Sequence, residues 1–242
     1  MICKTGTALV LGAVLAGCAT GPNANPRDPL EPFNRGVSGF NDAVDNAVLK
    51  PVATVYRDVT PSLVQTGVNN FFGNLGDVLS AANAGLQLRP RVAVENLMRV
   101  SVNTVFGLGG LLDIATEMGI ERTRVDFGQT LGRWGVPSGP YLVMPIFGPS
   151  SIRDASGFVV DNSGDLVGRV SDVSSRNSLT ALRVVDTRAG LLRATNLLEG
   201  AALDKYSFVR DLYLQRRDNQ IMDIIDEGWG LPPVTQDTDS SK

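Results

Sequence analysis

Apolar residues recur at helical spacing where the body of the chain begins. Steps of three and four residues separate them, and charged residues fall between them, as in Phe33, Val37, Phe40, Val44 and Val48. This period is typical of an amphipathic helix. It predicts a helix over residues 33–49, which Pro51 is expected to break or kink because proline lacks the backbone donor and crowds the preceding turn.

Further stripes with the same period follow along the chain. One begins after Pro61, a residue that suits the first turn of a helix, and predicts a helix over 63–83. Others cover 94–105, 182–192 and 209–213. Strand-like alternation is absent outside the middle of the chain, so the pattern predicts an all-α fold in one helical domain over 30–230. The polar residues 231–242 are expected to form a disordered tail.

The middle of the chain breaks this pattern. No charged residue occurs between Arg133 and Arg153, and the prolines and glycines of this stretch forbid a long helix. Such a segment is either buried in protein, in contact with lipid, or part of the lining of a cavity, because its backbone groups need partners. In a soluble chain a buried core loop would be favoured, whereas attachment to a membrane would favour lipid contact.

The first residues have the layout of an export signal. Lys4 precedes an apolar run from Ala8 to Ala16, which is shorter than the roughly 20 residues that span a bilayer. The run ends in Leu-Ala-Gly-Cys18, the pattern of a bacterial lipobox. We therefore expect a signal peptide over 1–17, a lipidated Cys18 and a flexible tether over 18–29. The alternative is an ordinary signal peptide that ends near a buried cysteine.

The amino-acid composition excludes several kinds of catalytic and binding site. The 242 residues include 2 Cys and no His, and the formal net charge is −3. Catalytic triads and imidazole-bound zinc are therefore excluded, and no basic stripe indicates nucleic acid as a partner. We expect no cofactor and no enzymatic activity.

Carboxylate chemistry is the one catalytic alternative that this composition leaves open, because a glycosidase needs only two acids brought together in space. The candidates are Asp28, Glu31, Glu95, Asp113 and Asp154. Simpler roles are available, since Asp28 and Asp113 suit the starts of helices and Asp154 can pair with Arg153. A carboxylate-dependent wall hydrolase is therefore one hypothesis for the function.

Six sequence blocks follow one another in order along the body of the chain. They span residues 28 to about 217 and begin with Asp28-Pro-Leu-Glu-Pro-Phe-Asn-Arg35, Asn70-Phe-Phe-Gly-Asn-Leu75 and Phe106-Gly-Leu-Gly-Gly-Leu-Leu-Asp113. The others are Phe127-Gly-Gln-Thr-Leu-Gly-Arg-Trp-Gly135, the stretch from Gly139 to Asp154, and Tyr213-Leu-Gln-Arg-Arg217. In this order, and with a lipobox just upstream, the six blocks resemble the MlaA (VacJ) family of lipoproteins. One departure from the family is a short C-terminal extension.

The resemblance implies a ring of amphipathic helices in the inner leaflet of the outer membrane, held by its lipid anchor beside a trimeric porin. An amphipathic channel would carry mislocalised phospholipid from the outer leaflet to a periplasmic, MlaC-like carrier. The family's apolar Pro/Gly-rich hairpin would fall on the uncharged segment, residues 134–149. The runner-up hypothesis is a structural lipoprotein that docks on a porin or the cell wall without transporting lipid.

Two sets of residues follow from the segment and the resemblance together. The candidate lipid path comprises Trp134, Tyr141, Leu142, Val143, Met144, Ile146 and Phe147. The candidate hinges, chosen because glycine tolerates backbone angles that other residues avoid, are Gly107, Gly109, Gly110, Gly135, Gly139 and Gly148.

Overall fold

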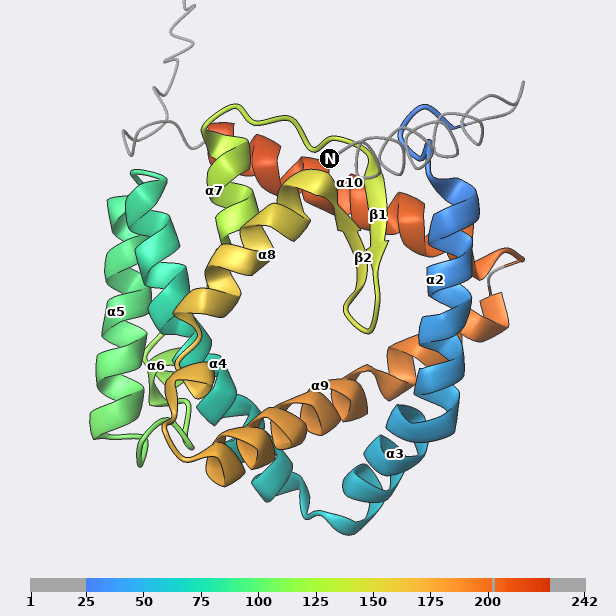
Figure 1. The fold of residues 1–242 in the computed structure, drawn as a ribbon. Helices are drawn as coiled ribbons and strands as arrows, with labels where there is room; N and C mark the ends of the chain where they lie inside the picture. The colour runs from blue at the N-terminus through green and yellow to red at the C-terminus, as the bar shows by residue number, and fades with distance from the viewer. Residues whose placement is uncertain (1–24, 202, 227–242) are drawn as a thin grey trace, which may run out of the picture.

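The computed structural model describes residues 25–201 and 203–226 as helices arranged in a ring around a β-hairpin (Figure 1). The predicted signal peptide, Cys18 and the whole of the predicted polar tail lie outside the described residues. The helices are α2 (Glu31–Val44), α3 (Lys50–Val59), α4 (Ser62–Leu86), α5 (Pro90–Val105), α6 (Ile114–Glu117), α7 (Phe127–Arg133), α8 (Ile152–Gly164), α9 (Val173–Ala201) and α10 (Lys205–Asp226). A π-helical turn, Asp45–Leu49, joins α2 to α3, and a 3-10 turn, Val167–Arg169, follows α8.

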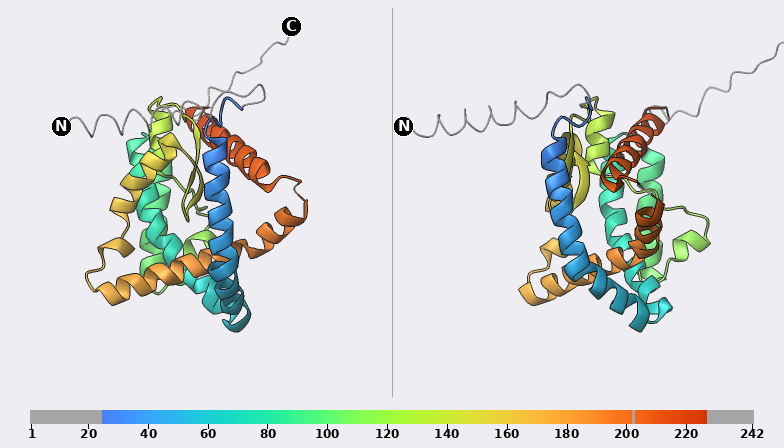
Figure 2. Two further views of the ribbon diagram at one scale, coloured as in Figure 1. Left: turned by 45° about the vertical axis from the view of Figure 1, so that its right-hand side comes forward. Right: turned by 90° about the vertical axis from the view of Figure 1, so that its right-hand side faces the viewer.

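The hairpin consists of β1 (Tyr141–Met144) and β2 (Gly148–Ser151), which pair antiparallel. It lies between α2 and α8 in Figure 1 and in the left view of Figure 2, and it contacts both helices. The all-α prediction is confirmed apart from this small sheet. No helix in the described part of the chain combines the length and apolarity needed to cross a bilayer.

Pro51 kinks the first predicted helix without ending it. The π-helical turn in front of the proline lets the amide of Lys50 donate to the carbonyl of Asp45, one residue further back than in an α-helix. The helix axis changes direction there, and α3 continues to Val59 (Figure 1). The wider turn accommodates the missing donor of Pro51, so the predicted helix is the first half of a longer bent one.

Many buried side chains of the ring are polar, and many of its large apolar side chains are exposed. Its largest fully buried side chains include Arg99, Gln87, Asn34, Asn96 and Asn103. In contrast, Phe33 and Phe40 on α2 are 53% and 54% exposed, and Val55 on α3 is 62% exposed. A surface helix in a water-soluble protein normally has the opposite orientation. The outer face of this ring is therefore unusually apolar.

Ion pairs close the ring between its N-terminal and C-terminal helices. Asp28, immediately before α2, accepts hydrogen bonds from Tyr206 at 2.6 Å and from Arg210 at 3.2 Å, both on α10. Arg35 on α2 makes a bidentate contact with Asp204 at 2.7 and 3.2 Å. These contacts join segments almost 180 residues apart in the chain.

A second charged cluster connects α8 to α10. Arg217 contacts Asp154 at 2.9 and 3.0 Å and Asp126 at 2.6 and 2.7 Å, and Tyr213 donates to Asp154 at 2.5 Å. Burial alone would raise the pKa of Asp154, but the hydrogen bonds and charge of Arg217, together with Tyr213 and Arg153, lower this pKa to about 2.

This depressed pKa makes the ring sensitive to acid. Because the folded carboxylate of Asp154 titrates below its ordinary value, its contribution is present above about pH 4 and disappears as the pH falls toward 2. The shift corresponds to about 2 kcal/mol of stability. We expect the urea midpoint in detergent to fall between pH 5 and pH 3, and to fall less in Asp154→Asn. An identical pH dependence in both proteins would contradict this assignment.

Candidate functional site

The hairpin occupies the centre of the ring, and its alternation determines which side chains face the core. Tyr141 and Val143 are 1% and 4% exposed and pack with Tyr206 and Leu214 of α10. Leu142 and Met144, on the opposite face, are half-buried. At the turn Ile146 has a φ of 70°, and Gly148, with a φ of 83°, begins β2. The uncharged segment is therefore neither a plain core loop nor wholly exposed.

Two asparagines of α2 hold the free edge of β1. Asn34 donates to the carbonyl of Tyr141 at 3.0 Å and accepts from the amide of Val143 at 2.9 Å. Two helical turns later, Asn41 donates to the carbonyl of Met144 at 3.0 Å and accepts from the amide of Ile146 at 2.7 Å. An amide side chain can both donate and accept, so each asparagine replaces part of a neighbouring strand. Sequence reasoning assigned neither residue this role, although Asn34 lies in the first of the six blocks and Asn41 follows it at a spacing of seven.

We expect Asn41→Ala to loosen the tip of the hairpin without unfolding the ring. The substitution removes two hydrogen bonds to the turn, so the amide of Ile146 should exchange with solvent about tenfold faster. Asn46→Ala, an exposed position on the following turn, is the control and should leave this exchange rate unchanged. Equal rates in Asn41→Ala and wild type would show that the asparagine does not restrain the tip.

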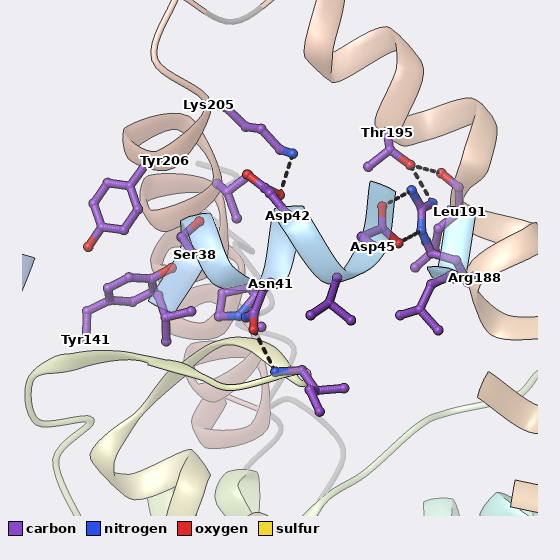
Figure 3. A pocket seen from close by; sticks show the side chains of 17 residues that line it. Ser38, Asn41, Asp42, Asp45, Tyr141, Arg188, Leu191, Thr195, Lys205 and Tyr206 are labelled. Carbon is purple, nitrogen blue, oxygen red and sulfur yellow. Dashed lines mark hydrogen bonds and ion pairs between the residues drawn. The ribbon is translucent and has the colours of Figure 1, made fainter. Parts of the chain in front are cut away.

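A partly open cavity of about 280 Å³ lies between α2, the hairpin, α9 and α10 (Figure 3). Its apolar lining includes Val44, Leu49, Ile146, Leu191 and Val209. Its polar residues are paired across the cavity: Lys205 contacts Asp42 at 2.8 Å, and Arg188 contacts Asp45 at 2.6 and 2.7 Å. The polar face of α2 is therefore turned toward this cavity, as Figure 3 shows for Asn41, Asp42 and Asp45. The cavity offers both apolar contact and fixed charges.

The structure brings together only part of the predicted lipid-path set. Tyr141, Val143 and Ile146 line the cavity, together with Gly148. Ile146 and Phe147 are 62% and 64% exposed at the hairpin tip. Trp134 lies apart at the end of α7, where its indole donates to the carbonyl of Leu86 at 3.2 Å and its ring contacts Phe127 edge-on at 5.9 Å.

The predicted hinge glycines occupy three separate turns. A positive φ occurs at Gly109, Gly110, Gly135, Gly139 and Gly148. Gly107 is required for a different reason: a Cβ there would lie 2.3 Å from the carbonyl oxygen of Leu112 and 2.4 Å from that of Asn103. Gly107 is therefore needed for close backbone packing. Hinge motion about the six glycines stays a prediction.

The five carboxylates of the hydrolase hypothesis are engaged in ion pairs and caps. Asp28 and Glu31 both contact Arg210, at 3.2 and 3.5 Å. Glu95 pairs with Arg91, and Asp113 caps α6 through the amide of Thr116, as its sequence position suggested. The predicted pair of Asp154 with Arg153 is present at 3.0 Å, in addition to Arg217. These pairings resemble structural ion pairs more than a catalytic pair of acids around a bond.

Exposed apolar side chains, called the outer belt below, lie on several elements of the ring. On α2, the π-helical turn and α3 they are Phe33, Phe40, Val48, Val52, Val55 and Val59, and on α5 they are Val94, Leu97, Met98 and Val105. The loop after α5 adds Phe106, Leu108, Leu111 and Leu112. Extended apolar surface of this kind indicates contact with a membrane or another protein. Polar groups inside and apolar groups outside fit a ring whose outer wall lies in lipid.

Comparison with known proteins decides the family. The family model described as MlaA lipoprotein matches residues 26–220. The chain belongs to this family. An MlaA relative from Escherichia coli, named as the lipoprotein of the intermembrane phospholipid transport system, is 36% identical over 88% of this chain and 86% of its own length. The protein of that name from Haemophilus influenzae is 33% identical over 93% of this chain and 94% of its own.

Two further similarities extend this result. An uncharacterised protein from Rickettsia typhi is 41% identical over 56% of this chain, and the match spans only about half of that relative, 54%. A solved structure described as the structural basis for maintenance of bacterial outer membrane lipid asymmetry is 34% identical, with a TM-score of 0.70 over 80% of this chain and 98% of the other. The resemblance to MlaA inferred from the six blocks is confirmed, and so is the helical fold.

Proposed function

We propose that this member of the MlaA family removes mislocalised phospholipid from the outer leaflet of the outer membrane and passes it through its ring to a soluble, MlaC-like carrier in the periplasm. The observation that carries the proposal is the inverted polarity of the ring. Its belt of exposed apolar residues favours acyl chains, whereas the cavity charges at Asp42 and Asp45 and their partners favour a headgroup. The names of the relatives support the same process.

The proposal gives the protein no catalytic step. Moving an intact phospholipid breaks no covalent bond. The protein has only to provide a path that keeps the charged headgroup out of hydrocarbon, because placing that charge in hydrocarbon costs several kcal/mol. The cavity beside the hairpin would provide such a path. Its paired charges, at Arg188 and Lys205, would face the headgroup, and Ile146 and Leu191 would face the acyl chains. A trimeric porin beside the ring would meet part of the apolar belt.

Deletion of the gene, followed by assay of phospholipid in the outer leaflet, tests this function. Because transport removes phospholipid from that leaflet, its content should rise in the deletion strain and return to normal when the gene is restored. The structural alternative, a lipoprotein that only docks on a porin, predicts unchanged surface phospholipid. That result would contradict the transport proposal.

We propose that lipid on Cys18 holds the ring at the membrane after the signal peptide 1–17 is removed. Two or more acyl chains anchor a protein stably, at about 0.8 kcal/mol per buried methylene. Cys18→Ser should therefore shift the protein into the soluble periplasmic fraction, measured by fractionation and immunoblotting. Full retention in the outer-membrane fraction would mean that the apolar belt alone anchors the ring.

A further inference from the structure

A second cavity lies where α4 and α9 cross, apart from the one beside the hairpin. Its volume is about 220 Å³, and α4 contributes Asn69, Phe72, Gly73, Gly76 and Asp77 to its wall. A Cβ at Gly76 would meet nothing within 4 Å, so this glycine faces open space. Arg183, Asp186 and Thr187 of α9 and Arg124 from the segment before α7 complete the wall. The cavity thus combines residues from three parts of the ring.

Asp186 presents a buried carboxylate to this cavity. The residue is only 6% exposed and accepts hydrogen bonds from the Tyr56 hydroxyl at 3.0 Å and from Asn69 at 3.3 Å. Burial and this carboxylate raise the pKa of Tyr56 to about 12, so its hydroxyl remains a donor. Within residues 25–201 and 203–226 no cation lies within ion-pair distance of Asp186. A buried carboxylate with only neutral donors has remaining capacity to bind a cation.

Two arginines supply the opposite charge in the same cavity. Arg183 holds a bidentate contact with Asp165 at 2.8 and 2.9 Å and lies 6.0 Å from the ring centre of Phe72. Arg124 is exposed and makes neither a hydrogen bond nor an ion pair with any other residue of the described chain. A guanidinium matches phosphate oxygens bidentately, which makes arginine the preferred partner of a phosphodiester.

We propose that this cavity binds the headgroup of a zwitterionic phospholipid, with Arg124 and Arg183 facing the phosphodiester and Asp186 accepting a hydrogen bond from a primary ammonium group. A phosphoethanolamine headgroup contains both charges. An anionic glycerol headgroup or free phosphate would satisfy the arginines but leave Asp186 without a cation. The proposal rests on the transport function and adds a preference among headgroups.

Native mass spectrometry of the full lipidated protein in detergent tests this preference. The protein is offered phosphatidylethanolamine and phosphatidylglycerol with the same acyl chains in equal amounts. Wild type should retain about tenfold more phosphatidylethanolamine than phosphatidylglycerol, because phosphatidylethanolamine makes one more charge-assisted hydrogen bond. Glycerophosphoethanolamine in excess should compete for the cavity, and inorganic phosphate should not.

Two variants separate the contributions of the charges. Asp186→Asn should reduce the preference to near unity by lowering retention of phosphatidylethanolamine alone. Arg124→Gln, at an exposed position where folding is insensitive, should lower retention of both lipids about threefold, because both carry the phosphodiester. Arg216→Gln, an exposed arginine on α10, is the matched control and should retain both lipids as wild type does.

Equal retention of the two lipids by wild type would overturn the headgroup proposal, and so would an Asp186→Asn variant that keeps the full preference while melting like wild type. Displacement by inorganic phosphate would reassign the cavity to free anions and equally overturn it. The transport function survives these outcomes, since it requires only that phospholipid is bound. The transport function itself would be contradicted if the protein retained neither phospholipid and the deletion strain had normal surface phospholipid.

Discussion

Replacing Arg99 with methionine should destabilise the ring by about 3–5 kcal/mol, because the change removes the buried cation that pairs with Asp113 and Asp77. Arg99 lies on α5 and is fully buried. It contacts Asp113 at 2.7 and 2.8 Å and Asp77 at 3.3 Å, and it also donates to the carbonyl of Ile120. Arg122 still reaches Asp77 at 3.0 Å, but it is 3.9 Å from Asp113. Asp113 is therefore the carboxylate that loses its closest cation.

Urea unfolding in detergent, followed by circular dichroism, measures this effect. Arg91→Met is the matched control, because Arg91 lies on the same helix and pairs with Glu95 while its side chain is 89% exposed. Exposed ion pairs contribute little, so the control should remain within about 0.5 kcal/mol of wild type. A stability loss below about 1 kcal/mol for Arg99→Met would contradict the view that buried charge pairs hold these helices together.

Phe147→Asp should abolish phospholipid transport while the ring remains folded. Phe147 is 64% exposed at the hairpin tip and touches Phe158 at a ring distance of 4.7 Å, so the substitution removes little core packing. A carboxylate placed beside acyl chains costs about 2.5–3.5 kcal/mol, which corresponds to a transfer rate about 100-fold lower. Cells that carry only this variant should accumulate surface phospholipid like the deletion strain.

Phe147→Leu separates loss of the aromatic ring from introduction of charge. This variant keeps an apolar tip and should transport phospholipid near the wild-type rate, with the same helix content by circular dichroism as Phe147→Asp. Normal surface phospholipid in cells carrying a folded Phe147→Asp protein would place the hairpin tip outside the path of the lipid.

Helices α2, α4 and α5 were predictable from the sequence because their apolar stripes are long and regular, whereas α7 and α8 were not predicted and α9 and α10 extend well beyond the stripes that indicated them. The period of Phe33, Phe40 and Val48 identified the first helix, yet it could not show which face points inward. Periodicity records that two faces differ in polarity and contains no information about the solvent on either side. The structure turns Asn34 and Asn41 inward and the two phenylalanines outward.

The polar interior could not be predicted in the same way. Arg99 reaches partners 14 and 22 residues away on other elements, and the pairs that close the ring join residues more than 160 positions apart. Each partner, taken singly, resembles an ordinary surface charge. The absence of charge from 134 to 152 correctly identified the hairpin segment as unusual. Its two strands depend on hydrogen bonds from α2, which no local pattern signals.

Photochemical crosslinking with a phospholipid that carries a reactive group on its acyl chain tests most directly whether lipid enters the ring. After irradiation of the protein in outer membranes, peptides are sequenced by mass spectrometry to locate the adducts. Passage through the ring predicts adducts on Ile146 and Leu191, which line the cavity, as well as on Phe40 and Val55 of the outer belt. Adducts confined to the outer belt, with none on the residues lining the cavity, would contradict passage of phospholipid through the ring.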